Sequence, residues 1–184
     1  MSEPPLRLAV LGDVHGHLTL AFRVGRVYTF TRGERSVRIG ALGGISERGK
    51  PGRDPVSEYY VAHDVRALKQ ARHDILLSHE PPLGAATTLH PKYADGGSPD
   101  CAEVLRAQRP RLHFCGHYHE PGALLDSPAG VRSYQLNAVN FLRADRLNPG
   151  CIAIVAWNDA DDAQVELLDP TWLREYTRHS WRHR

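Results

Sequence analysis

The sequence of 184 residues lacks the features that mark several classes of protein. Its three cysteines, Cys101, Cys115 and Cys151, are odd in number, far apart and without Cys-x-x-Cys spacing, which argues against a disulfide framework and a zinc–thiolate site. No apolar run approaches the length of a membrane span, and the first residues lack the basic start and long apolar stretch of a secretory signal. We therefore expect a cytoplasmic protein with no membrane partner.

The sequence also lacks a large excess of charge of either sign and several common catalytic motifs. The 23 Lys and Arg residues and 21 Asp and Glu residues leave a net charge of +2, too small to attract nucleic acid without a local patch. No Gly-Lys-Ser/Thr follows the glycines at 43–44, and no Gly-x-Ser-x-Gly nucleophile motif occurs. Histidine, by contrast, is plentiful, with eleven residues. Histidine chemistry is therefore the first functional hypothesis.

The apolar segments predict an α/β fold. Strands are expected at 7–11, 27–31, 36–39, 74–77 and 111–115, with a hairpin turn at 32–34. The first strand is apolar enough to be buried on both faces. Apolar runs near 133–141, 151–157 and 164–168 predict a meander of antiparallel strands.

Helix and loop signals complete this prediction. Helices are expected at 18–24, from an N-cap at Asp64 to residue 70, and from an N-cap at Ser98 to residue 108. Glycine and proline predict loops at 43–55 and 83–97. Strands that alternate with helices and are followed by further strands predict a layered α/β sandwich built from βαβ units plus C-terminal antiparallel strands.

Three predicted strands end in histidine-rich segments. The residues concerned are Asp13, His15 and His17 after the first strand, His79 after 74–77, and His117 and His119 after 111–115. The carboxyl ends of parallel strands converge on one crevice in an open α/β sheet, so these side chains are expected to meet. Imidazoles with one carboxylate suit zinc, manganese or iron and not calcium. Singly, each cluster is better explained as a surface histidine or a turn; together they predict a metal centre.

These segments resemble three motifs of one superfamily. Gly-Asp-Val-His-Gly-His at 12–17, Ser-His-Glu-Pro-Pro at 78–82 and Gly-His-Tyr-His at 116–119 are similar to the first, fourth and fifth motifs of the calcineurin-like metallophosphoesterases. Residues 39–44 and 57–82 are also similar to the branch that contains RNA lariat debranching enzymes. The resemblance implies a metallophosphoesterase domain over residues 1–170, followed by a basic C-terminal tail at 171–184.

The resemblance implies a centre with two divalent ions, manganese, iron or zinc. By the family pattern, Asp13, His15 and His119 bind one ion, whereas His79 and His117 bind the other. Two family motifs are missing after His17: a Gly-Asp motif whose aspartate bridges the ions, and a Gly-Asn-His motif whose asparagine binds the second ion. We therefore expect a truncated sheet and a first site with three ligands. The second site should bind its ion weakly, so a centre with only one ion is the alternative to a centre with two.

Several other residues have two interpretations. Asp54, His63 and Asp64 could replace missing ligands, but a helix cap at Asp64 and solvated positions for the others are the simpler explanation. His17 could contact a phosphate or face solvent, and it is the candidate substrate-binding residue. No catalytic residue is assigned. Arginines alternate with aromatic side chains in the tail, which could bind nucleic acid, but a last helix with a frayed basic end explains them better.

The resemblance implies a hydrolase of phosphate esters, in which a metal-activated hydroxide attacks phosphorus. The debranching-like stretch favours a phosphodiesterase over a phosphatase. The main alternative is a degenerate, non-catalytic domain that keeps the fold as a metal-binding or interaction module. A nucleic-acid-binding module and a longer segment between His17 and Tyr28 in the intact protein are the others. The sequence specifies neither the substrate nor the oligomeric state.

Overall fold

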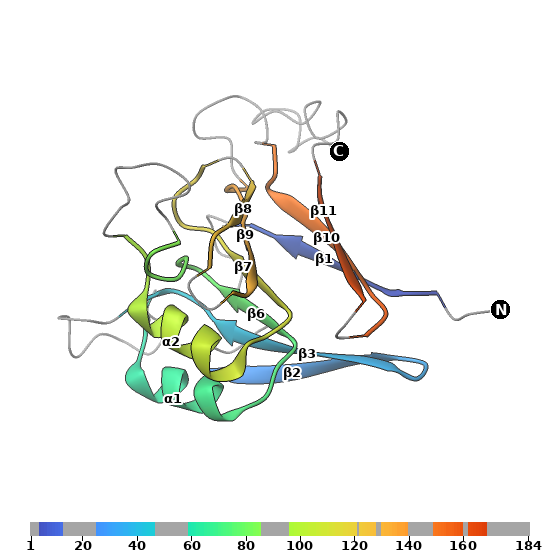
Figure 1. The fold of residues 1–184 in the computed structure, drawn as a ribbon, viewed down its shortest axis with the longest axis horizontal. Helices are drawn as coiled ribbons and strands as arrows, with labels where there is room; N and C mark the ends of the chain where they lie inside the picture. Colours follow the sequence, from blue (N-terminus) through green and yellow to red (C-terminus); the bar gives the residue numbers. More distant parts are fainter. Residues whose placement is uncertain are drawn as a thin grey trace, which may run out of the picture.

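A computed structural model describes residues 4–12, 25–46, 59–85, 96–120, 122–127, 130–139, 149–159 and 162–168. Within them lie two main β-sheets, a two-stranded sheet and two helices (Figure 1). The expected α/β class is therefore confirmed as a mixed α/β fold with two sheets. Other predictions lie outside the described residues: the helix at 18–24, Asp13, His15, His17, Asp54 and the tail at 171–184.

The larger sheet has six strands in the order β2-β3-β6-β7-β9-β8. These are β2 (Arg26–Arg32), β3 (Arg35–Leu42), β6 (Ile75–Ser78), β7 (Leu112–Cys115), β9 (Arg132–Gln135) and β8 (Ala123–Leu125). β3, β6, β7 and β9 run parallel, whereas the edge strands β2 and β8 are antiparallel to their neighbours. The expected antiparallel meander is thus wrong for β9, which joins β7 in parallel. Every residue of β7 is buried, as in a parallel strand covered on both faces.

The β2–β3 hairpin forms where the turn signal predicted it. Arg32 pairs with Arg35, so Gly33 and Glu34 alone make the turn. Gly33 has a φ of 59°, the left-handed conformation required at the first central position of a type II′ turn. Glycine adopts this conformation without steric cost, and the hairpin is therefore locally encoded.

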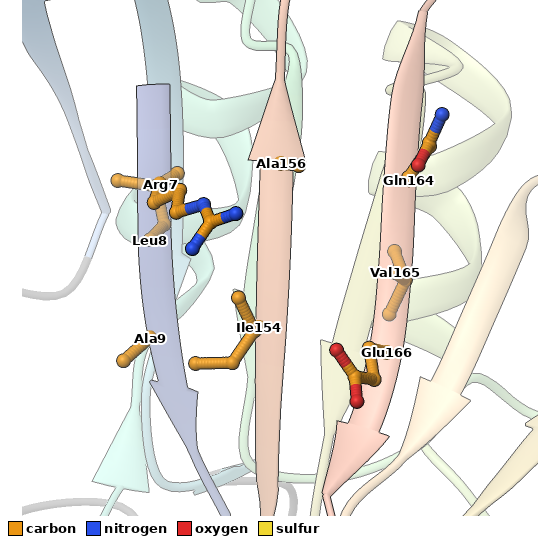
Figure 2. Close-up of a pocket in the computed structure, with 8 residues that line it drawn as sticks. All are labelled: Arg7, Leu8, Ala9, Ile154, Ala156, Gln164, Val165 and Glu166. Carbon is orange, nitrogen blue, oxygen red and sulfur yellow. The ribbon is translucent and has the colours of Figure 1, made fainter. Parts of the chain in front are cut away.

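The smaller sheet is entirely antiparallel. It contains β1 (Leu6–Leu11), β10 (Ile152–Trp157) and β11 (Ala163–Leu168) in the order β1-β10-β11. β1 alternates between half-buried and exposed residues, and Leu11 is 53% exposed, so the expectation of burial on both faces is wrong. Figure 2 shows Arg7, Ile154 and Glu166, one from each strand, on the open face of this sheet. An antiparallel sheet can leave one face to solvent in this way.

The core lies in two layers on either side of the large sheet. One layer packs the two sheets together through Ile75, Phe114 and Trp157, and Trp157 Nε1 donates a hydrogen bond to Ser36 O at 3.2 Å. The other layer lies beneath the helices and includes Leu68 and Leu105. Figure 1 shows both helices on the side of the large sheet away from the small one. The described residues therefore form a layered arrangement of sheet, sheet and helices.

The helices α1 (Ala62–Gln70) and α2 (Pro99–Gln108) differ in how well their starts were predicted. Ser98 caps α2 as expected: its Oγ accepts a hydrogen bond from Cys101 N at 3.0 Å. α1 starts earlier than expected, with Val61 at the N-cap. Asp64 lies in the first turn, where its Oδ2 accepts the N–H of Val61 at 3.0 Å, half of a capping box. Asp64 thus stabilises the start of the helix from inside it.

A short parallel pair, β4 (Ile45–Ser46) and β5 (Tyr59–Tyr60), corrects part of the loop expected at 43–55. In the described part of the chain, no helix has the length and apolar character needed to cross a membrane.

Candidate metal centre

Two of the predicted ligand residues meet at the carboxyl edge of the large sheet. His79 follows β6, and His117 follows the neighbouring parallel strand β7, so both loops leave the sheet at the same edge. His117 Nδ1 lies 2.9 Å from His79 Nε2. The rings stand edge to face, with centroids 4.8 Å apart and an interplanar angle of 70°. We call His79 and His117 the histidine pair.

The backbone that carries His117 is strained. Its φ is 75°, and Tyr118 N donates a hydrogen bond to Gly116 O at 3.0 Å across it. This three-residue pattern is that of the γ-turn with positive φ, a rare conformation. His119 also has a positive φ, of 54°. Residues other than glycine pay about 1–3 kcal/mol for such conformations, which persist only where the surrounding structure holds them.

The end of β1 reaches the same edge from the other sheet. Gly12 N donates to Cys151 O at 2.8 Å, and Asn137 N donates to Gly150 O at 2.9 Å. A Cβ on Gly12 would overlap the carbonyl oxygen of Asn137, which follows β9. The convergence of β1 with β6 and β7 was expected within one parallel sheet. Instead, β1 lies in the other sheet, and its end meets residues 136 and 137 after β9, where only glycine fits.

The described residues contain a pair of donors and no larger group. Among them, no three His, Cys, Asp or Glu side chains are gathered so that they could hold a metal ion, so His119 does not complete a three-ligand site with the histidine pair. His119 itself is half-buried in the loop after β7. The described chain stops at Gly12, immediately before Asp13, and resumes at Gly25.

The chemistry of the histidine pair fits a transition metal. Imidazole nitrogens are ligands for zinc, manganese or iron. Two ligands with metal bonds of about 2.0–2.1 Å lie about 3.3 Å apart at a tetrahedral angle and about 2.9 Å apart at a right angle. The observed separation of 2.9 Å falls in this range. In the metal-free protein this contact is an N–H···N hydrogen bond between the two rings, and the same separation is compatible with two ligands of one ion.

A buried polar cluster lies next to His79 in the fold. His113 on β7 is fully buried, with Nε2 2.8 Å from Ser78 Oγ and Nδ1 3.1 Å from Ser133 Oγ. Burial, with a smaller contribution from His73, lowers the pKa of His113 to about 3, so the ring is neutral. Ser78 is also the residue before His79. Sequence analysis missed His113; the signal was a histidine inside an otherwise apolar strand.

Glu80, the carboxylate next to His79 in the sequence, is bound elsewhere. Its Oε2 accepts from Ser46 N at 3.0 Å and from Tyr60 Oη at 3.4 Å. Tyr60 is buried, which raises the pKa of its hydroxyl, and it also shares a short hydrogen bond with Ser98 Oγ. These bonds tie the loop after β6 to β4, β5 and the start of α2.

The two possible substitute ligands that the structure describes lie on α1. His63 is exposed, and the carboxylate of Asp64 is bound to the backbone of Val61. The simpler interpretation of Asp64, as a residue that stabilises a helix start, is therefore the appropriate one.

No protein-family model matches the chain, and no curated protein matches it. Among solved structures, the chain is similar to the crystal structure of TT1561 of Thermus thermophilus, with 14% sequence identity and a TM-score of 0.48. The match covers 78% of this chain and 57% of that one, so the chain spans little more than half the length of TT1561.

Proposed function

We propose that this protein is a metal-dependent hydrolase of phosphate esters, with a phosphodiester as the favoured substrate class. The observation that carries the proposal is the histidine pair, with two ring nitrogens 2.9 Å apart on loops from adjacent parallel strands. The sequence motifs at 12–17, 78–82 and 116–119 support the same proposal through their resemblance to the metallophosphoesterases.

In this proposal the histidine pair holds one divalent ion, while Asp13, His15 and His119 supply the ligands of the other. A bound divalent ion polarises phosphoryl oxygens and lowers the pKa of water towards ~7. The residues of the chain bind the ions and orient the phosphate ester. The strained turn at His117 supports this role, because such conformations cluster at functional sites.

A second candidate is a metal-binding or interaction domain without catalysis. The binding of the Glu80 carboxylate to Ser46 and Tyr60 favours it, since this acid is thereby engaged away from the histidine pair. Two neutral imidazoles without a negative charge hold a divalent ion less strongly than a site that includes a carboxylate. Turnover, measured together with the metal content of the purified protein, separates the candidates.

The decisive experiment combines metal analysis with turnover of p-nitrophenyl phosphate and its bis ester in the presence of manganese. We compare the wild type with a His79→Ala, His117→Ala double variant and an Asp13→Ala, His119→Ala double variant. His63→Ala is the matched control, because His63 is an exposed histidine on α1. Loss of activity should exceed the roughly 10–100-fold effect typical of residues that only support metal ligands.

Three results are informative. Turnover that both double variants abolish and His63→Ala retains supports the hydrolase. Bound metal without turnover above the variants supports the non-catalytic domain. A wild type that binds no metal and shows no turnover contradicts the hydrolase and a metal-binding domain, and leaves the interaction domain.

A further inference from the structure

Gln135 lies beside the loop that carries His117. It is the last residue of β9 and is fully buried. In the parallel pairing of β7 and β9, its partner is Cys115, the residue that precedes Gly116. A buried amide group has a substantial cost unless its donors and acceptor are satisfied, so its partners indicate its role.

The Gln135 amide is bound chiefly to the Gly116 turn. Its Nε2 donates to Gly116 O at 2.7 Å and to Leu136 O at 2.9 Å, which uses both N–H groups. Its Oε1 accepts from Cys115 Sγ at 3.6 Å. Gly116 O is the same oxygen that accepts from Tyr118 N in the γ-turn at His117.

This contact acts on the conformation of His117. Gly116 O and His117 N belong to one planar peptide unit. A donor that fixes the direction of this carbonyl therefore also fixes the orientation of the peptide plane from which the φ of His117 is measured. On its other side, Gly116 donates its own N–H to His79 O at 2.9 Å. Gly116 is thus held by Gln135 from one direction and by His79 from the other.

We propose that Gln135 is a positioning residue that holds the left-handed turn at His117 and so presents the histidine pair to a metal ion. The presentation of the pair rests on the proposed function, whereas the hold on the turn does not. The bland alternative is that Gln135 only satisfies a buried carbonyl and contributes to general stability.

The test uses Gln135→Met, which keeps the approximate shape of the side chain and removes both donors. The first readout is hydrogen exchange of the Tyr118 amide in the metal-free protein, which reports on the turn. The second is the affinity for Co²⁺, followed by visible absorption. Val37→Ala is the control, because Val37 is fully buried on β3 and its loss lowers global stability without touching Gly116.

We expect faster exchange of the Tyr118 amide in Gln135→Met and a Co²⁺ affinity reduced by roughly 10–100-fold, as for other residues that orient metal ligands. Val37→Ala should change neither. Gln135→Asn, which withdraws the amide by one methylene, should show the same losses and serves if the Met variant does not fold.

Unchanged exchange at Tyr118 in both Gln135 variants would overturn the proposal, as would equal losses in Val37→Ala. If exchange at Tyr118 is faster in the variants but the wild type binds no Co²⁺, Gln135 does stabilise the turn at His117 and the proposed function is refuted instead.

Discussion

His113 Nε2 lies 2.8 Å from Ser78 Oγ, and this bond joins the interior of β7 to the last residue of β6. The other ring nitrogen lies 3.1 Å from Ser133 Oγ on β9. One buried imidazole therefore bridges three neighbouring parallel strands immediately before the loop of His79. The ring of this bridge is neutral, because burial, with a smaller contribution from His73, lowers the pKa of His113 to about 3.

The first prediction concerns acid stability. In the unfolded chain, His113 takes up a proton near pH ~6.5, whereas the folded protein keeps it neutral, so the free energy of unfolding should fall as pH drops from ~6.5 towards 3, by about 1.4 kcal/mol per pH unit for this group. Burial lowers the pKa of His73 as well, which adds a loss of the same sign.

His113→Phe should reduce the slope and lower stability at neutral pH by about 1–3 kcal/mol. Urea unfolding at several pH values between 7.5 and 4.5 measures both the slope and the stability at neutral pH. Val37→Ala, which removes no titratable group, should keep the wild-type slope; an equal slope in His113→Phe would contradict the prediction.

The second prediction concerns Arg38 and Asp74, which tie β3 to the start of β6. Arg38 donates from Nε to Oδ2 at 3.0 Å and from Nη2 to Oδ1 at 2.6 Å, and its backbone N also donates to Oδ2, at 2.9 Å. Burial alone would raise the pKa of the Asp74 carboxyl, but these bonds and the charge of Arg38 outweigh it and lower the pKa. Asp74→Asn should therefore lose about 1–2 kcal/mol of stability at pH 7.

The lowered pKa of Asp74 also fixes a pH window for this difference. The stabilisation is complete above the usual carboxyl pKa of ~3.9 and is lost as pH falls below it towards the folded-state value. Urea titrations of the wild type and of Asp74→Asn should therefore converge in acid. A constant difference down to the lowest pH would show that the lost stability does not come from the charge.

The third prediction concerns the close approach of Gly12 and Asn137. In Gly12→Ala the added methyl group overlaps the carbonyl oxygen of Asn137, so the two backbone segments must move apart. We therefore expect a loss of more than about 2 kcal/mol in the free energy of unfolding. Gly130→Ala is the control: Gly130 has a φ of 67° but open space around it, so only the conformational cost of about 1–2 kcal/mol applies. A smaller loss for Gly12→Ala than for Gly130→Ala in urea unfolding would refute the close contact.

The fourth prediction concerns the strain at His117. At a φ of 75° glycine should be favoured over alanine by about 1–2 kcal/mol, so His117→Gly should unfold at higher urea concentration than His117→Ala. Arg109, the left-handed C-cap of α2 with a φ of 47°, provides a positive control in which Arg109→Gly should also exceed Arg109→Ala. The reverse order at His117, with the expected order at Arg109, would show that the turn relaxes once the imidazole is removed.

Local signals in the sequence predicted the elements whose stability depends on a few neighbouring residues. The β2–β3 hairpin follows from Gly33 in its two-residue turn, and α2 follows from the Ser98 hydroxyl and the proline after it. The residue types at 79 and 117, and their places after two strands, were also readable. All of these depend on short-range chemistry, which a window of a few residues contains.

Only the tertiary structure decided which strands pair and how the histidines are held. β1 belongs to the antiparallel sheet and β9 to the mixed six-stranded one, because strand partners are chosen by burial against segments far away in the chain. The same holds for Gln135 at Gly116 O and for the positive φ of His117, which the surrounding bonds impose against local preference. The sequence determined which side chains are available for a metal; long-range packing determined that two of them stand 2.9 Å apart.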